Sequence, residues 1–529
     1  MASPSLPVRR VRPAPLARSA VPTTRPVAHV APATRILAAA LALGAAGDLL
    51  FYGQRAGLSV LLFVLLLLGV GVALGRMERV RVQRANLWLV IPLLFFAAMI
   101  GVRANSVLTS LNGALVAGLL GLLAYFYAAG RIASLGLLGY PVVLATVARR
   151  LLLEPRGPLQ SIRHAAGRHE QRVRLAAPLL RGGLVALPVL LVFALLLTSA
   201  DTIFADYVGR LLRFQFLRDL PELLWRSAQV LGVGWLVAGG LLYALRRRGA
   251  RAATAQLTAP GSLTANHQLG FIEGATVLGL VNVLFLGFAW VQFTYLFSGQ
   301  AARTLQFEAY REYVRRGFGE LLVVAVLTML LILGLRWVTW QETVRETRIL
   351  NALSTLLIGL AFVMLLSAFR RMTDWESIEY YINTPLRLYV RWFLFWLGAA
   401  FLWLLGTLWL RPQRFAIGAF VIALAFCASI NGINPDADVA AANLARHDEL
   451  STRYLYVLSE DAIPALVAGL DGSSNQTQRD LHAYLTYQLT MMEADPSWQT
   501  WPAFHLARRQ AYRQLVDLRR VGILPPIRH

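Results

Sequence analysis

The carboxylates and amides that interrupt the apolar stretches of this chain are the residues with the best opportunity for chemistry. Glu273 and Glu320 each stand near the start of an apolar run, and Asn282 and Gln292 follow within the first of these runs. Because burying an ionisable group in lipid is costly, such residues are functional candidates in a membrane protein. Two structural interpretations compete: a carboxylate suits the start of a helix, and an amide can join neighbouring helices by hydrogen bonds.

Spacing argues against a continuous polar stripe along this run. A helix turns about 100° per residue, so Glu273 and Asn282 face opposite ways. Asp48, inside the first apolar run, is a third isolated carboxylate, close enough to a run end to reach the interface. The four residues around 273–320 therefore remain candidates for lining a cavity without forming an evident path.

Two further patches lie at predicted boundaries between lipid and water. The first contains Arg370, Arg371 and Asp374, followed by aromatic residues, and is also typical of an interfacial belt. The second contains Asn434 and Asp436 around a proline, and also suits a helix stop and turn. Each patch is a functional candidate with a structural alternative.

Motifs for catalysis, nucleotides or metals are missing from the sequence. No P-loop, H-E-x-x-H or G-x-S-x-G pattern occurs. His164 and His169 are five residues apart, which is a poor spacing for one metal-binding helix face. The single cysteine, Cys427, lies deep in an apolar run and can form neither a disulfide within the chain nor a cysteine metal site. We expect no catalytic residues, no metal site and no cofactor.

The elements that carry these residues are predicted to be membrane helices. The chain has 529 residues, of which 57% are apolar and only 15% charged, against about 25% charged in soluble domains. About 20 apolar residues cross the hydrocarbon core as a helix. The continuous apolar runs predict eleven spans at 36–52, 58–75, 86–102, 107–129, 182–199, 223–245, 271–297, 318–336, 349–369, 388–410 and 414–430. The predicted fold class is all-α, a polytopic transmembrane bundle with a small helical C-terminal extramembrane domain.

Arginine distribution sets the expected topology. Residues 132–148 are apolar, but treating them as interfacial or re-entrant keeps the large arginine clusters on one side. With eleven spans and a cytoplasmic N-terminus, 28 arginines lie inside, 14 in outer loops and 9 in the tail, as the positive-inside rule requires. We expect a multi-pass plasma membrane protein with an extracytoplasmic C-terminal domain. The net charge of +23 is thus assigned to the membrane rather than to nucleic acid.

Four regions follow from this division. Residues 1–35 form a basic arm whose composition favours disorder, 36–181 the first membrane helices with a basic cytoplasmic loop, and 182–433 the core membrane domain. Residues 434–529 contain 11 acidic and 9 basic residues and show helical spacing, which predicts a helical domain able to meet a protein partner. The lipid bilayer is the other expected partner.

Short stretches spread over more than half of the chain resemble one family. They are TSADTIF at 198–204, EGATVLGLVN at 273–282, QFTYLF at 292–297, YVRRGFGE at 313–320, SAFRRM at 367–372, NPD at 434–436, NLAR at 443–446 and LSEDAIP at 458–464. With these the chain resembles the bacterial membrane proteins of domain of unknown function 4173, related to 4153. It departs from that pattern at 380–385, where YYINTP replaces a Tyr-Gly-Leu-Thr-type turn. The resemblance implies a multi-spanning plasma membrane protein and supplies no reaction, ligand or partner.

Three functions stay open at this point. The first is a non-enzymatic scaffold, sensory or envelope component whose outer domain meets a partner. The second is a transporter or lipid-handling protein built around Glu273, Asn282, Gln292 and Glu320. The third is a membrane-embedded transferase that uses outer-face acids such as Asp201, Asp374 or Glu376. A polar inner cavity would favour the second function, and a groove with two carboxylates about 5–9 Å apart the third.

Overall fold

The structure is a computed structural model of the whole chain. It describes residues 30–128, 130–160, 215–246, 269–292, 307–377, 384–445 and 455–525. Within these ranges the regular structure is helical, apart from one isolated bridge between Leu269 and Thr339. The predicted all-α class is confirmed.

Nine helices in the described ranges are long and apolar enough to cross a membrane. The helices that contain them are α1 (Val30–Phe51), α2 (Leu58–Met77), α4 (Ser106–Tyr125), α9 (Gln215–Arg246), α11 (Phe271–Gln292), α13 (Phe307–Val338), α14 (Val344–Ser377), α15 (Pro385–Leu410) and α16 (Phe415–Ile433). Each corresponds to a predicted span. The predicted span 86–102 is a shorter apolar helix, built from η1 (Arg84–Leu89) and α3 (Val90–Met99). The predicted span 182–199 lies outside the described residues.

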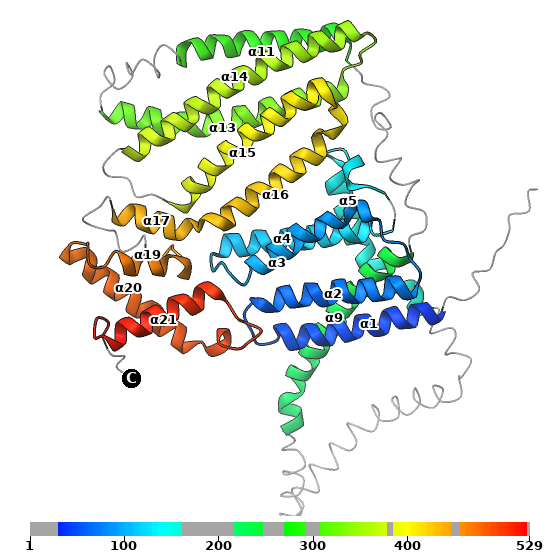
Figure 1. The fold of residues 1–529 in the computed structure, drawn as a ribbon, viewed down its shortest axis with the longest axis vertical. Helices are drawn as coiled ribbons and strands as arrows, with labels where there is room; N and C mark the ends of the chain where they lie inside the picture. Colours follow the sequence, from blue (N-terminus) through cyan, green and yellow to red (C-terminus); the bar gives the residue numbers. More distant parts are fainter. Residues whose placement is uncertain are drawn as a thin grey trace, which may run out of the picture.

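The spanning helices run side by side, and the C-terminal domain sits at one end of them (Figure 1). This domain end of the bundle carries the α1–α2 and α3–α4 loops, because both loops contact the domain. α1 therefore begins at the opposite end. α9 runs antiparallel to α1, since Arg226 near its start bonds Asp48 near the end of α1 at 2.7 Å. α4 ends at the end of the bundle opposite the domain, and α9 begins at the domain end.

Three apolar cores hold the bundle together. One joins α11, α13, α14 and α15 around Leu357 and Phe401. A second joins α2, α3, α4 and the helix α5 (Gly139–Leu153) around Leu93 and Phe96. The third joins α1, α2 and α9 around Leu242. α16 connects the first two, because its start packs in the first core and Cys427 packs in the second. In Figure 1, α16 lies between the two groups of helices.

Close approach between α1 and α9 depends on glycine. A Cβ on Gly44 would lie 2.3 Å from the carbonyl oxygen of Val230, and one on Gly234 would lie 3.3 Å from that of Ala40. Small residues of this kind let membrane helices approach closely, where van der Waals packing replaces the missing hydrophobic force. The ion pair of Asp48 then fits between the same two helices.

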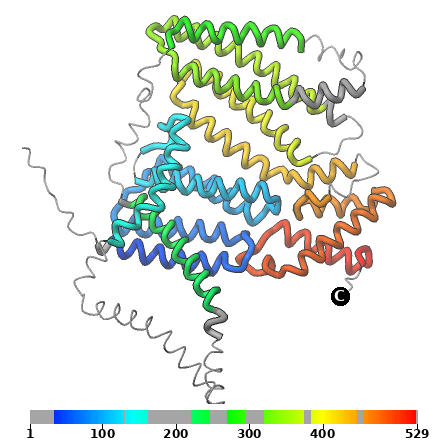
Figure 2. Tube along the Cα trace, turned by 180° about the vertical axis from the view of Figure 1, so that it is seen from behind, coloured from blue at the N-terminus to red at the C-terminus, as the bar shows by residue number. Residues whose placement is uncertain are grey.

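The segment predicted to be interfacial or re-entrant forms η2 (Ile132–Ser134) and α5 (Gly139–Leu153). α5 has 15 residues, fewer than the roughly 20 that a span requires. Val143 and Val147 are buried in the core that α5 shares with α4. The indole nitrogen of Trp235 in α9 donates to the carbonyl of Leu152 at 3.2 Å. In Figure 2, α5 lies on the side of the bundle away from the C-terminal domain, and α9 runs obliquely across α1 and α2.

The C-terminal domain has a core of its own. Its helices are α17 (Pro435–Leu444), η6 (Glu460–Ala462), α19 (Ile463–Ala468), α20 (Asn475–Ala494), η7 (Pro496–Trp498) and α21 (Leu506–Arg520). Tyr484, Leu485 and Leu515 are fully buried within it. The core also receives Leu388 from the first turn of α15, so the domain packs directly on the bundle. The described helices after residue 434 thus share one apolar core.

Candidate functional site

A buried polar network joins the C-terminal domain to the bundle. We call it the polar clamp, and its four members are Asn105, Asp436, Ser459 and Asp461. The Nδ2 of Asn105 donates to both carboxylate oxygens of Asp436, at 3.1 and 3.0 Å. Ser459 donates to Asp436 through its backbone N–H at 3.1 Å and also through its hydroxyl. The carboxylate of Asp436 therefore joins a segment 23 residues away to one 331 residues away.

Asp461 forms the second half of the clamp. Its Oδ2 accepts from the backbone N–H groups of Ala104 and Asn105 at 2.7 and 2.9 Å. Its Oδ1 is buried without a hydrogen-bond partner among the described residues. Only 2% of Asp461 is exposed, and this burial raises the pKa of its carboxyl group, although the two backbone donors and Arg103 oppose the rise.

Local helix chemistry positions these side chains. Asn105 is the N-cap of α4, because its Oδ1 accepts from the N–H groups of Val107 and Leu108. Asn434 occupies the left-handed region at φ 55°, which ends α16 and caps α17. Its Nδ2 also donates to the carbonyl of Asp461 at 3.2 Å. Short polar residues favour such caps. Asn105 and Asn434 therefore cap helices and also form hydrogen bonds across the domain junction.

A second group of contacts surrounds the clamp. The guanidinium of Arg103 donates to the carbonyls of Asn431 and Gly432 at 2.7 and 3.1 Å. His505 is 2% exposed, and its Nε2 lies 3.1 Å from the carbonyl of Arg103. Burial lowers the pKa of His505 to about 4, so the ring is neutral at pH 7 and donates through Nε2. Arg508 pairs with Glu460 at 3.1 Å beside it.

Backbone hydrogen bonds close the junction at the start of α2. The N–H groups of Leu58 and Ser59 donate to the carbonyls of Phe504 and Pro502 at 3.0 and 2.8 Å. A Cβ on Gly57 would lie 2.5 Å from the carbonyl oxygen of Phe504. Glycine is thus required at 57 for this approach.

A paired amide lies one layer deeper in the bundle. Asn112 in α4 and Asn431 in α16 donate to each other at 2.8 and 2.9 Å, and both are fully buried. Reciprocal amide pairs satisfy both side chains inside a membrane bundle. The pair fixes α16 against α4 directly beneath the clamp.

The residues predicted to line a cavity take separate structural positions. Glu273 is exposed in the first turn of α11 and accepts from the N–H of Gly270 at 2.8 Å. Asn282 is buried and donates to the carbonyls of Leu278 and Leu353, whereas Glu320 is exposed on α13. Glu273 and Asn282 thus face opposite ways, as their spacing predicts.

The remaining residue of that set, Gln292, belongs to another contact. Its Oε1 accepts from the hydroxyl of Ser367 at 2.8 Å and from the guanidinium of Arg371 at 3.1 Å. Gln292 and Arg371 were predicted in separate patches and are buried together where α11 meets α14. Arg370 is exposed beside them.

Several predicted candidates lie beyond what the structure describes. Asp374 and Glu376 belong to α14, but their side chains are outside the described part, as are His164, His169 and Asp201. Cys427 is buried in an apolar core, as expected. The candidates Asn434 and Asp436 do meet, since both contact the 459–461 segment.

Sequence reasoning missed Asn105, Ser459, Asp461 and His505 as parts of one site. Ser459 and Asp461 lie in the LSEDAIP stretch that carries the family resemblance, which is the signal that could have selected them. The only signal for Asn105 in the sequence is its position directly before an apolar run. Nothing in the sequence joins it to Asp461, which is 356 residues away.

The arrangement is suited to holding elements together rather than to turnover. Asp436 is 1% exposed, and donors from Asn105 and Ser459 occupy its carboxylate. Carboxylate oxygens that accept several N–H and O–H bonds are poorly available to a cation or a proton donor. Among the described residues, no group of three or more His, Cys, Asp or Glu side chains is placed to hold a metal ion.

Fold and composition together define an integral membrane protein with an all-α, polytopic bundle. The model of the family described as Domain of unknown function (DUF4153) matches residues 90–469, which is most of the chain. The chain belongs to this family. The related family 4173, which the sequence stretches suggested, is not the one that matches. No curated protein and no solved structure matches the chain.

Proposed function

We propose that this protein is a non-enzymatic scaffold, sensory or envelope component that holds its C-terminal domain rigidly at one membrane face for a protein partner. The polar clamp carries the proposal. Buried carboxylates are costly unless they are hydrogen-bonded, and here both oxygens of Asp436 and one oxygen of Asp461 accept bonds that join the domain to the α3–α4 loop. A domain attached in this way keeps a fixed position on the bundle.

The geometry gives less support to a transporter path. A transporter path would bring Glu273, Asn282, Gln292 and Glu320 around one cavity, whereas two of them are exposed at separate places and two bind neighbouring helices. A transferase would need accessible carboxylates. The acids that meet at the domain junction are 1% and 2% exposed, so a substrate has no access to them; the acids named for a transferase, Asp201, Asp374 and Glu376, lie outside the described side chains.

We further propose that the membrane is the plasma membrane and that the domain faces the extracytoplasmic side. Support comes from the arginines, of which 28 lie in the arm and loops predicted to be inside. α1 begins at the end of the bundle opposite the domain. A cytoplasmic N-terminus thus places the domain outside.

The partner surface that we propose is an exposed aromatic patch on the domain. Tyr456, Val457, Tyr487 and Met491 are 52%, 73%, 43% and 47% exposed. Tyr456 and Tyr487 stack edge to face, with ring centroids 5.5 Å apart, and Tyr487 and Met491 are one helical turn apart on α20. Exposed aromatic and methionine side chains are enriched at protein interfaces.

The test is site-specific photo-crosslinking of the full chain in living cells. A photoreactive residue at Val457, Tyr487 or Met491 is expected to give an adduct of one defined mass, and the same residue at exposed Asp517 is the matched control. No adduct from the patch, or equal adducts from the control, would contradict the partner surface. The membrane side is tested separately: after Cys427→Ala, Asn475→Cys should react with an impermeant maleimide on intact cells.

A further inference from the structure

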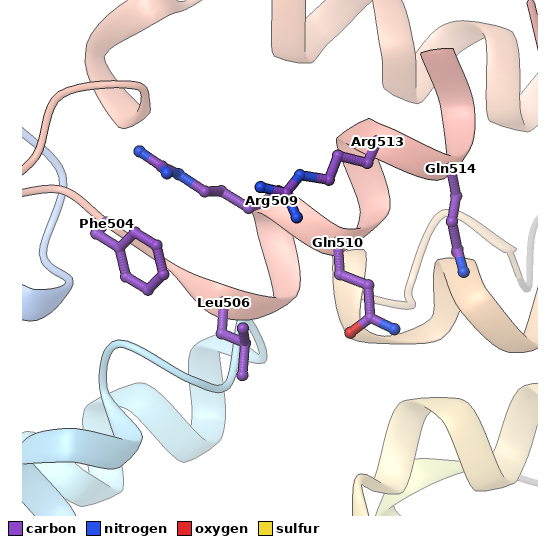
Figure 3. Close-up of a pocket in the computed structure, with 6 residues that line it drawn as sticks. All are labelled: Phe504, Leu506, Arg509, Gln510, Arg513 and Gln514. Carbon is purple, nitrogen blue, oxygen red and sulfur yellow. The ribbon is translucent and has the colours of Figure 1, made fainter. Parts of the chain in front are cut away.

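One face of α21 forms a hollow beside the bundle. Leu506, Arg509, Gln510, Arg513 and Gln514 recur at the spacing that places side chains on one helix face. Together with Phe504 they line a pocket of about 400 Å³ (Figure 3). Figure 3 shows the two arginine side chains on one side of the α21 ribbon, with Leu506 and the two glutamines on the other. Pockets of roughly 300–1,000 Å³ accept small ligands.

The two pocket arginines differ from the other arginines of this helix. The other three pair with carboxylates: Arg508 with Glu460 at 3.1 Å, Arg519 with Glu493 at 2.8 Å and Arg520 with Asp517 at 3.5 Å. Neither Arg509 nor Arg513 has such a pair within the part of the chain that the structure describes. The guanidinium of Arg509 instead lies over the ring of Phe504, 4.6 Å from its centroid. Two uncompensated guanidinium groups one turn apart suit an anion, and guanidinium geometry suits phosphate.

The glutamines supply neutral partners. The Oε1 of Gln514 is buried and has no hydrogen-bond partner among the described residues. A buried polar atom of this kind calls for a donor. That oxygen has almost no accessible surface, so the amide of Gln510, exposed at the pocket rim, is the group that can meet a ligand hydroxyl next to the phosphate.

The pocket lies at the edge of the bilayer. α21 begins against the bundle, because the N–H of Leu506 donates to the carbonyl of Gly101 just after α3, and it leads away from the ends of α1 and α2 (Figures 1 and 2). At 1.5 Å per residue, Arg509 and Arg513 are about 4 and 10 Å further along the helix axis. Each headgroup layer is roughly 5–8 Å thick. Arg509 therefore lies within the headgroup layer and the backbone of Arg513 just beyond it, where a long arginine side chain can reach back towards a phosphate, with 48%-exposed Leu506 on the hydrocarbon side.

We propose that this pocket binds the headgroup of an anionic phospholipid. The phosphate lies between Arg509 and Arg513, a headgroup hydroxyl meets Gln510, and the acyl chains pass Phe504 and Leu506 along the bundle. The shared chemistry is a phosphate ester, and its position at the bilayer edge selects the lipid over a soluble phosphate. The site is independent of the proposed protein partner, whose patch lies on α20 and the 456–457 segment.

The experiment is native mass spectrometry of the full chain released from nanodiscs of phosphatidylglycerol and phosphatidylcholine. We expect the wild type to retain phosphatidylglycerol preferentially. Arg509→Gln/Arg513→Gln should lower this retention about thirtyfold, at roughly fivefold for each arginine near an anionic surface. The matched control is Arg479→Gln/Arg520→Gln, which removes the same charge from exposed positions of the same domain.

Each outcome decides the proposal. Loss in the pocket variant alone supports it, and so does loss in Leu506→Glu, which adds a negative charge at the pocket while leaving both arginines in place. Equal retention in all variants overturns it. A third arm adds inorganic phosphate at millimolar concentration: displacement of the lipid by free phosphate would assign the pocket to a soluble ligand and overturn the lipid assignment. Unchanged thermal unfolding of the variants shows that they are folded.

Discussion

Removing the carboxylate of Asp436 tests whether the polar clamp holds the C-terminal domain on the bundle. In Asp436→Ala, the Nδ2 of Asn105 and the N–H of Ser459 lose their acceptor in a buried site. The Ser459 hydroxyl can turn to Asp461, whose Oδ2 is 3.4 Å away. Each unsatisfied buried donor costs about 1–3 kcal/mol, and relief from burying a charge offsets part of this.

We take about 3 kcal/mol as the net cost, which raises the population of the undocked domain roughly a hundredfold. Backbone amides at the junction report this opening directly. The N–H groups of Leu58, Ser59 and Leu506 bond across it, so their hydrogen exchange should accelerate by about two orders of magnitude. The amide of Leu485, within the core of α20, should keep its protection because the domain itself remains folded.

The matched control is Asp438→Ala, which removes an exposed carboxylate from the same turn of α17. It should leave exchange at Leu58 and Leu506 unchanged. The reasoning is refuted if Asp436→Ala exchanges like the wild type at the junction. It is also refuted if Leu485 loses protection to the same extent as the junction, because the clamp would then stabilise the domain rather than its docking.

Three further outcomes follow from the structure. Burial lowers the pKa of His505 from 6.5 to about 4, so the unfolded state binds more protons than the folded state between these pH values. The contribution of His505 to stability is therefore full above about pH 6.5 and falls by up to about 3 kcal/mol towards pH 4. His505→Gln should flatten this pH dependence in thermal unfolding. Gly44→Ala places a Cβ 2.3 Å from a carbonyl of α9 and should cost about 1–3 kcal/mol, whereas Gly69→Ala, with nothing within 4 Å of its Cβ, should leave the melting temperature unchanged. Asn112→Leu and Asn431→Leu should each lower the free energy of unfolding by about 1–2 kcal/mol, because each leaves the other amide without its partner. The double variant should lose less than the sum of the two losses. Strict additivity in detergent unfolding would disprove the pairing.

The spanning helices were predictable because their signal is local. A run of apolar residues is sufficient to define a helix in lipid, so the predicted span 388–410 corresponds to Pro385–Leu410 and 414–430 to Phe415–Ile433. The span 86–102 was harder to define, because η1 and α3 share that run. The glycine contact that brings α1 against α9 has no local signature, since Gly44 looks like any other small residue in a span.

The candidate site was predictable only in part, for the same reason. Asn434 and Asp436 form a helix stop that the sequence displays, and the structure uses both at the domain junction. Their partner Asn105 is 331 residues from Asp436. Pairing over that distance depends on how α4 and α16 pack, which hydropathy does not encode. The buried contact of Gln292 with Arg371 is a second case: the sequence selected both residues as candidates but did not predict that they contact each other.

An exposed ion pair of Arg55 with Asp495, at 2.6 Å, also crosses the domain junction, but the clamp itself fixes the domain without an ionic bond. Asp436 and Asp461 are held by backbone, amide and hydroxyl donors, and Arg103 directs its guanidinium to the carbonyls of Asn431 and Gly432 instead of to either acid. Salt screens exposed ion pairs far more than buried hydrogen bonds, so docking should persist at high ionic strength. A buried polar group that loses its hydrogen-bond partner costs free energy, so such groups favour one docked arrangement of the domain over others more than they strengthen its binding to the bundle. A clamp of this kind therefore sets where the domain faces, which is the property that a presented binding surface needs.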